Sequence, residues 1–331
     1  MTRVRPLLRG RRIRSALATG LLAAAFALPA AAFDLQGHRG ARGLAPENTL
    51  AAFERALAVG VHTLELDVGI TADGVPVIVH DIALSPAVTR DERGRWITDS
   101  PLVRSLTLEQ LQRFDVGRLD PASAYSRPFA DQAPSDGERI PTLASLFARV
   151  ATLGATRVRF NIETKIDPRR PADTADPDTF ARVILKAVRD AGMLERVTLQ
   201  SFDWRTLQAA RRLAPGLATA CLTTESGAAD VRDAAGTWTA GLRLVDHGSV
   251  PRLVKAAGCD AWSPNFRHLE EAGVREAQAL GLQVIPWTVN QPADMARLLD
   301  WKVDGLITDF PDRLRELLAS RGLALPPRYP R

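Results

Sequence analysis

The sequence predicts an α/β protein that folds as a closed (β/α)8 barrel with an insertion after the hairpin of its second strand. Eight β-type runs are centred near residues 36, 65, 160, 199, 220, 261, 285 and 306, and a helical pattern follows each of them. Strands that alternate with helices are typical of parallel βα units, and eight such units form a barrel. An open doubly wound sheet is the alternative, but the turn over residues 37–43 lacks the GxGxxG spacing of a dinucleotide site.

The first 32 residues have the three parts of a secretory leader. Six arginines and no acidic residue come before an apolar run over residues 16–28, and the segment ends in Ala30-Ala31-Ala32. The apolar run is too short to span a bilayer comfortably. We therefore expect cleavage near Ala32, a mature domain over residues 33–331, a periplasmic or secreted location, and no stable membrane insertion.

The charge balance argues against a nucleic-acid partner. The 331 residues have a formal net charge of +5 and a pI near 9.7. The leader holds six of the 43 basic residues, which leaves 37 basic and 38 acidic residues and a net charge of −1 for the mature chain. A nearly neutral body has no basic footprint for DNA or RNA.

Cys221 and Cys259 are the two cysteines of the chain. They could form one bridge in an oxidising compartment. On the predicted layout one lies late in its strand and the other at the start of the next, so we expect two buried thiols at opposite ends of the barrel.

The first two predicted strands introduce the polar residues of interest. Residues 33–38 form the first strand, and a helix over residues 49–59 follows with Asn48 as its N-cap. In the second strand, Glu65 and Asp67 lie on one face roughly 7 Å apart, close enough to share a divalent cation. If Asp73-Gly74 is the tip of a type I′ hairpin, the return arm places His80 opposite Asp67.

Residues 81–141 are predicted to be an insertion that packs over one end of the domain. They hold many turn residues and prolines and little periodicity, apart from a short helix over residues 107–114. The regular pattern then resumes. The further predicted strands are 157–163, 196–201, 217–222, 259–262, 282–288 and 303–308, and the helices are 142–153, 178–191, 203–213, 250–257, 269–280, 292–300 and 311–320.

Active sites of such barrels lie at the carboxyl ends of the strands. The polar residues that the sequence places there are His38, Arg39, Glu65, Asp67, His80, Asn161, Glu163, Lys165, Gln200, Ser201, Trp287, Asn290, Thr308 and Asp309. Three carboxylates without cysteine suit Ca²⁺ or Mg²⁺. Two histidines suit an acid–base pair, and an arginine with a lysine suits an anionic substrate. Together they fit metal-dependent hydrolysis of a phosphate ester.

Each residue taken singly also has a structural explanation. His38 alone would be a hydrogen-bonded turn residue, and Glu163 could simply pair with Lys165. Trp287 on an apolar strand would be a core residue, and Asp309 would cap the last helix.

The motifs together resemble the glycerophosphodiester phosphodiesterase family across the mature chain. The segments that carry the resemblance are His38-Arg39-Gly40, Pro46-Glu47-Asn48-Thr49, Glu65-Leu66-Asp67, Asp73-Gly74, His80-Asp81, Asn161-Ile162-Glu163-Thr164-Lys165, Gln200-Ser201-Phe202, Trp287-Thr288-Val289-Asn290 and Asp304-Gly305-Leu306-Ile307-Thr308-Asp309.

The resemblance implies metal binding by Glu65, Asp67 and Glu163, with Ca²⁺ or Mg²⁺ as the ion. It implies His38 and His80 as general acid and base, and Arg39 and Lys165 as phosphate contacts. Trp287 is a further candidate for substrate binding, and Gln200 and Phe202 are additional candidate site residues. The implied reaction converts small glycerophosphodiesters such as glycerophosphocholine to sn-glycerol 3-phosphate and an alcohol.

Three other functions fit parts of the pattern. A phospholipase D-like or cyclic-phosphate-forming enzyme could use the same centre, but a membrane-facing enzyme should show more than 6% aromatic residues or a basic rim. A glycosidase with two carboxylates would leave both histidines and Lys165 without a role. A non-catalytic phosphodiester-binding protein gives no reason for paired histidines.

Overall fold

The computed structural model describes residues 1–2 and 33–330. The predicted leader falls almost entirely outside the described residues, and residues 33–330 belong to one compact unit. No helix among the described residues is long and apolar enough to cross a membrane.

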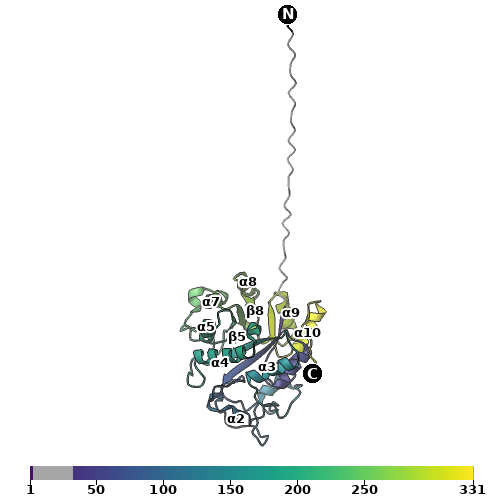
Figure 1. Cartoon of the computed structure of the whole chain (residues 1–331), viewed down its shortest axis with the longest axis vertical. Coiled ribbons are helices and arrows are strands. Elements are labelled where there is room, and N and C mark those ends of the chain that lie inside the picture. The colour runs from purple at the N-terminus through teal and green to yellow at the C-terminus, as the bar shows by residue number, and fades with distance from the viewer. Residues whose placement is uncertain (3–32, 331) are drawn as a thin grey trace. The chain divides into compact units, whose positions relative to one another are not determined.

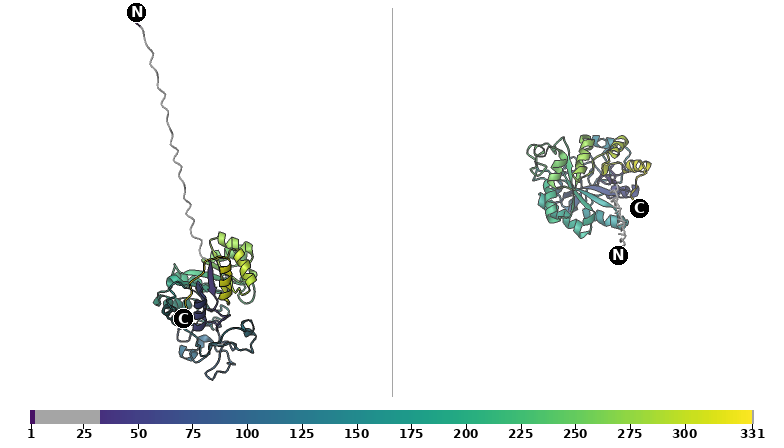
Figure 2. Two further views of the ribbon diagram at one scale, coloured as in Figure 1. Left: turned by 90° about the vertical axis from the view of Figure 1, so that its right-hand side faces the viewer. Right: turned by 90° about the horizontal axis from the view of Figure 1, so that it is seen from above.

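Eight parallel strands form the predicted barrel, and the helices lie around them (Figures 1 and 2). The neighbours follow the order β8-β7-β6-β5-β4-β2-β1-β9. The strands are β1 (Asp34–Gly37), β2 (Thr63–Ile70), β4 (Arg159–Thr164), β5 (Val197–Ser201), β6 (Ala218–Thr223), β7 (Ala261–Pro264), β8 (Gln283–Val284) and β9 (Gly305–Thr308), and β3 (Pro76–Ile78) pairs antiparallel with β2.

The last gap of the barrel is closed by single backbone hydrogen bonds. The predicted strand 282–288 is regular only over β8, yet Asp304 N donates to Val284 O at 2.9 Å and Ile307 N donates to Pro286 O at 3.0 Å. Pro286 has no N–H to give, which interrupts a regular ladder. The strand therefore ends early while its chain still follows β9.

Helices connect the strands, and all of them except α6 contain buried residues. They are α1 (Leu50–Val59), α2 (Leu108–Leu111), α3 (Leu143–Thr152), α4 (Pro177–Asp190), α5 (Trp204–Leu213), α6 (Leu244–His247), α7 (Val250–Ala257), α8 (Glu271–Ala279), α9 (Pro292–Asp300) and α10 (Pro311–Ser320). The predicted N-cap of the first helix is wrong by one residue: the Thr49 hydroxyl accepts the N–H of Ala52, and Asn48 has a left-handed φ of 57°.

The hairpin register also differs by one residue from the prediction. Val79, rather than His80, lies opposite Asp67, and its N–H donates to Asp67 O at 2.9 Å. Of the two expected tip residues, only Gly74 has a positive φ, at 78°. The loop is thus a three-residue turn that ends in a left-handed glycine, which shifts the pairing from that of a type I′ turn.

The insertion over residues 81–141 has an apolar cluster of its own against β3. It contains the 3₁₀ helices η1 (Val103–Ser105) and η2 (Ala124–Phe129) and the short helix α2 within the predicted 107–114. Its cluster is built from Val77, Leu84, Val103, Leu111 and Ile140. Figure 1 shows α2 at one end of the barrel, where the carboxyl ends of the strands lie.

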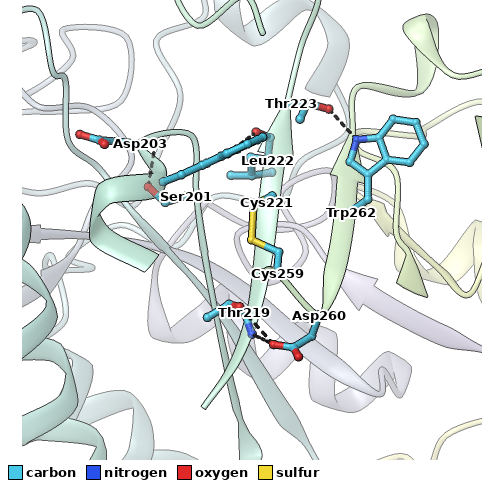
Figure 3. Close-up of a disulfide and its surroundings, with 10 residues drawn as sticks. Ser201, Asp203, Thr219, Cys221, Leu222, Thr223, Cys259, Asp260 and Trp262 are labelled. Carbon is cyan, nitrogen blue, oxygen red and sulfur yellow. Dashed lines mark hydrogen bonds between the residues drawn. A yellow bond between two sulfur atoms is a disulfide. The ribbon is translucent and has the colours of Figure 1, made fainter. Parts of the chain in front are cut away.

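The expectation of two separate thiols is wrong, because Cys221 and Cys259 form a buried disulfide between β6 and the segment before β7 (Figure 3). The two Cα atoms are 5.9 Å apart. Strand β7 begins at Ala261 rather than at residue 259, and Ala261 pairs with Ala220. Cys259 therefore lies in the connection that approaches β6, and not at the far end of the barrel.

Candidate active site

Three buried carboxylates meet at the carboxyl ends of two neighbouring strands. Glu65 and Asp67 lie on β2 and Glu163 on β4, and the parallel register pairs Asp67 with Glu163. One carboxylate oxygen from each residue lies within 4.8 Å of the other two. The alternation of β2 sends both of its acidic side chains to the same face, as predicted. The geometry thus assembles the three predicted metal ligands.

A dense set of donors fixes the orientation of these carboxylates. Glu65 accepts the backbone N–H of Arg39 at 2.9 Å and the side-chain amide of Gln200 at 2.8 Å. Asp67 accepts the amide of Asn48 at 2.9 Å. The left-handed backbone of Asn48, a residue that tolerates such a φ, turns its side chain toward the strand. Asn48 therefore supports the carboxylate cluster, a role that differs from the predicted N-cap.

The chemistry of the cluster fits a divalent cation. Burial, together with the charges of Asp67 and Glu163, raises the pKa of Glu65 well above its usual range. Burial raises the pKa of Glu163 to about 7 in spite of Lys165. The Oδ1 atom of Asp67 is buried and accepts no hydrogen bond. These carboxylate oxygens repel one another, and the Oδ1 atom of Asp67 has lone pairs that accept no hydrogen bond. Such a set of donor atoms suits a hard cation.

Two cationic side chains border the cluster, as predicted. The Nζ atom of Lys165 lies 2.6 Å from Glu163 Oε1 and 3.3 Å from Asp67 Oδ1. The Nε atom of Arg39 lies 3.3 Å from Asp67 Oδ2. These charges, with that of His80, hold the pKa of Asp67 well below its usual range although burial opposes this. Both cations are placed to meet an anionic group at the cluster.

Each predicted catalytic histidine has an aspartate partner. The Nδ1 atom of His38 lies 2.6 Å from Asp309 Oδ1, and the Nδ1 atom of His80 lies 2.7 Å from Asp81 Oδ1. Both imidazoles also lower the pKa of Asp67 through charge, and His80 lines the same cleft as Glu163 and Lys165. Because Nδ1 is held in each ring, Nε2 is the nitrogen left for a substrate.

Asp309 does not cap the last helix. The N-cap of α10 is Phe310, and no side chain caps it. Asp309 instead joins His38 to Asn290, whose amide donates to its Oδ2 atom at 2.6 Å. Sequence reasoning had placed Asp309 at the end of a strand, but its pairing with His38, 271 positions away, depends on barrel closure.

The two histidines have different surroundings. Burial lowers the pKa of His38, and the adjacent Asp309 opposes this shift. Burial, reinforced by Arg39 and Lys165, lowers the pKa of His80 to about 4. The imidazole of His80 is also the more open, with one third of its side chain exposed. Each ring is therefore mainly neutral near pH 7 in the absence of a bound anion.

The insertion contributes a residue to the site that the sequence did not single out. The phenol of Tyr125, in η2, accepts from Arg39 Nη1 at 3.0 Å and donates to Glu47 Oε2 at 2.6 Å. Glu47 in turn lies 2.5 Å from Arg39 Nη1 and 3.0 Å from Arg42 Nε. The guanidinium of Arg42 covers the Tyr125 ring at 4.7 Å from its centroid. No local sequence pattern predicts the contact of Tyr125 with Arg39 and Glu47.

The predicted aromatic contacts lie beside one another, in the segments after β5 and β8. Phe202 packs edge-on against Trp287 with ring centroids 5.5 Å apart. Trp287 Nε1 donates to Ser263 O at 2.9 Å, so the indole is anchored to β7. Gln200 is buried and bonds Glu65 and Asn161, which makes it a support of the acidic cluster.

A cleft of about 370 Å³ opens from this centre. It begins at His80, Glu163 and Lys165, runs along Phe202, and reaches Trp238 in the connection after β6. The cleft thus adjoins the acidic cluster.

Comparisons with known proteins find one family along most of the chain. The model of the glycerophosphoryl diester phosphodiesterase family matches residues 38–313. A glycerophosphodiester phosphodiesterase of Caldanaerobacter subterraneus is 30% identical over 287 residues, which cover 86% of this chain and 97% of that protein. One of Bacillus subtilis is 28% identical and covers 83% of both chains.

Solved structures share the fold. A candidate glycerophosphoryl diester phosphodiesterase from Silicibacter pomeroyi superposes with a TM-score of 0.78 at 38% identity, covering 89% of this chain and 95% of that one. An Oleispira antarctica phosphodiesterase, solved with its product sn-glycerol-3-phosphate, has a TM-score of 0.65 at 21% identity, covering 86% and 96%. The matched span runs from the first histidine motif into the last helix, and we conclude that this chain belongs to the glycerophosphoryl diester phosphodiesterase family.

Proposed function

We propose that this protein hydrolyses glycerophosphodiesters such as glycerophosphocholine to sn-glycerol 3-phosphate and an alcohol, with a divalent cation held by Glu65, Asp67 and Glu163. The observation that carries the proposal is the meeting of three buried carboxylates with two His–Asp pairs and two cations at one end of the barrel. A sugar hydrolase would need only two carboxylates and would leave the paired histidines unused.

The cation would be Ca²⁺ or Mg²⁺, because all three protein ligands are oxygens and none is a thiolate or an imidazole. When bound, it supplies positive charge to the phosphoryl oxygens in the transition state. The chain's own cations add to this: Arg39 presents a planar guanidinium and Lys165 a point charge to the same group. Both are already buried beside Asp67, so they need little reorganisation.

The two imidazoles supply the proton transfers. In the proposed reaction a water molecule attacks phosphorus and gives a proton to Nε2 of one histidine. The bond between phosphorus and the alcohol oxygen breaks, and Nε2 of the other histidine gives a proton to that oxygen. Asp309 and Asp81 hold the rings through Nδ1 and stabilise the imidazolium form of each. The overall reaction consumes one water molecule and leaves the total number of protons on the two histidines unchanged.

We propose that the mature protein is exported and comprises residues 33–331, with residues 81–141 as an insertion within one domain. The leader-like composition of residues 1–32 supports export. The buried disulfide between Cys221 and Cys259 also supports it, because such bonds persist in oxidising compartments. Amino-terminal sequencing of the protein recovered from the periplasm or medium would test this, and a protein retained in the cytoplasm with its first residues intact would contradict it.

A product assay tests the activity. The mature protein is incubated with glycerophosphocholine, glycerophosphoethanolamine and glycerophosphoinositol, and glycerol 3-phosphate and free alcohol are both measured. Release of both products in equal amounts supports the proposal. A cyclic phosphate, or cleavage of intact phospholipid instead, would assign the protein to the alternative phosphodiesterases. Binding without any turnover would indicate the non-catalytic function.

The variants His38→Ala and His80→Ala separate the histidine roles from binding. We expect a large loss of turnover in each, with metal binding kept. Near-normal turnover in either variant would remove that histidine from the acid–base pair.

A further inference from the structure

The cleft beside the acidic cluster has few free hydrogen-bonding groups. We call it the side cleft and define it by its lining residues His80, Asp81, Ile82, Ala83, Leu102, Glu163, Thr164, Lys165, Ile166, Asp167, Arg170, Phe202, Ala229 and Trp238. Four segments contribute to it: the chain after β3 that includes the insertion, the end of β4 with the connection after it, the connection after β5, and the connection after β6. Half of its lining residues are apolar. The hydrogen bonds and charges of the other half therefore decide which chemical groups the cleft can bind.

Apart from the indole N–H of Trp238, which is buried and has no hydrogen-bond partner among the described residues, the polar groups of the lining side chains are engaged with one another or with neighbours. His80 bonds Asp81 at 2.7 Å, and Lys165 bonds Glu163 at 2.6 Å. Arg170 Nε donates to Asp167 at 3.1 Å. The Thr164 hydroxyl donates to Ser201 at 2.8 Å. A polyol placed in the cleft would therefore leave hydroxyl groups poorly paired, which costs binding energy.

The charge of the outer half of the cleft is negative. Once Glu163 and Lys165 serve the cation and the phosphate, Asp81, Asp167 and Arg170 remain, with a formal sum of −1. Arg170 is further compensated by Asp173, whose Oδ2 atom lies 3.4 Å from Arg170 Nη1. An anionic substituent would thus be repelled there, and a cationic one attracted.

Two aromatic residues line the same cleft from different connections. Phe202 is held edge-on against Trp287, and Trp238 is buried, with its backbone carbonyl accepting the N–H of Trp204. Aromatic rings attract weakly hydrated cations, and the guanidinium of Arg169 already lies 6.0 Å from the Trp238 ring centroid. A quaternary ammonium group at this ring would compete with Arg169, and it needs no hydrogen bond. Apolar walls, a small negative charge and aromatic residues together form a site for that chemistry.

We infer that the side cleft is a head-group subsite that selects a quaternary ammonium alcohol, the choline type, against polyol head groups. This rests on the proposed function only in assigning the second substituent of the phosphate to the cleft. The residues that set the selectivity are Trp238, Phe202 and Asp167, none of which takes part in the proton transfers.

The kinetic test compares head groups on the mature protein. We expect kcat/KM for glycerophosphocholine to exceed that for glycerophosphoinositol by about tenfold or more, since cation–aromatic contacts contribute about 1–2 kcal/mol when desolvated. Trp238→Leu should reduce this ratio several-fold, and so should Asp167→Asn, which keeps the size of the side chain. Trp301→Leu is the matched control, because Trp301 stacks on Arg297 at α9, and none of the residues that line the side cleft belongs to α9.

A binding measurement decides the inference separately from turnover. Choline and inositol are each titrated into the protein by calorimetry, with Ca²⁺ present. We expect weak saturable binding of choline that Asp167→Asn and Trp238→Leu both weaken, and no binding of inositol. Absence of turnover on every diester would overturn the proposed function while this titration still decides the subsite. An equal or higher preference for inositol, or choline binding unaffected by both variants, would overturn the inference.

Discussion

The phenol of Tyr125 lies 3.0 Å from Arg39 Nη1, so a residue of the insertion directly contacts a proposed phosphate ligand of the barrel. The same hydroxyl donates to Glu47, which also pairs with Arg39 and Arg42. The guanidinium of Arg39 is therefore fixed from two sides, by the loop after β1 and by η2. Packing of the insertion against this loop should thus affect phosphate binding.

The variant Tyr125→Phe tests that coupling. It keeps the ring that Arg42 covers and removes the hydroxyl alone. A hydrogen bond to a charged group contributes about 1.5–3 kcal/mol, so we expect KM for the diester to rise about tenfold, with a smaller change in kcat. Ser126→Ala is the control, since Ser126 lies in the same 3₁₀ helix and its hydroxyl donates to the local Ser123 O. Equal effects of the two variants would show that Tyr125 only stabilises the insertion.

The variant Asp309→Asn tests the pairing with His38 through a pH profile. Asp309 raises the pKa of His38 against the effect of burial, so loss of its charge should lower that pKa further. Whichever limb of the kcat profile His38 controls should move to lower pH. Turnover should fall on the order of 10²-fold, which is the scale of one general acid–base contribution. A profile that keeps both limbs in place would exclude the proposed role of Asp309.

The stability of the metal-free protein should report the lowered pKa of His80. Its pKa is about 4 in the folded protein, below the usual value of 6.5, so the unfolded chain binds more protons between these pH values. This group therefore contributes stability above pH 6.5 that is lost as the pH falls toward 4. In EDTA, urea denaturation of His80→Gln should lose less stability over this window than the original protein does. Parallel curves would contradict the assignment.

Removal of the disulfide should lower the free energy of unfolding without abolishing activity. Cys221 and Cys259 close a loop across 38 positions, and such a bond typically contributes about 2–4 kcal/mol. The double change of both cysteines to alanine, compared with the oxidised protein in urea denaturation, measures this contribution. Unchanged stability would mean that the bond adds nothing to the fold.

Sequence patterns predicted the barrel and most of its centre, because alternation within a strand and the count of βα units are local features. Glu65, Asp67 and Glu163 could be placed together since β2 and β4 are neighbours and their carboxyl ends coincide. The register of the hairpin could not be predicted, because it depended on whether Asp73 adopted a positive φ.

Contacts that depend on tertiary packing could not be predicted from the sequence. Tyr125 reaches Arg39 from a 3₁₀ helix 86 positions away, and Asp309 reaches His38 only after the barrel closes. The disulfide depended on where β7 begins, which differed by two residues from the predicted strand. Each of these required a distance between segments that no local pattern contains.

Metal binding by the carboxylate cluster can be measured without any reaction. The paired change of Glu65→Gln and Asp67→Asn removes two of the three anionic ligands while it keeps their size. Calorimetric titration with Ca²⁺ and Mg²⁺ should show saturable binding to the original protein and to the control Glu316→Gln, an exposed residue of α10, and none to the paired variant.

The most direct measurement of the central claim is the release of glycerol 3-phosphate from glycerophosphocholine by the mature protein before and after EDTA. The proposed centre predicts that EDTA abolishes release, that added Ca²⁺ or Mg²⁺ restores it in the original protein, and that neither restores it in the paired Glu65 and Asp67 variant. Undiminished release in EDTA would contradict a catalytic cation held by these carboxylates.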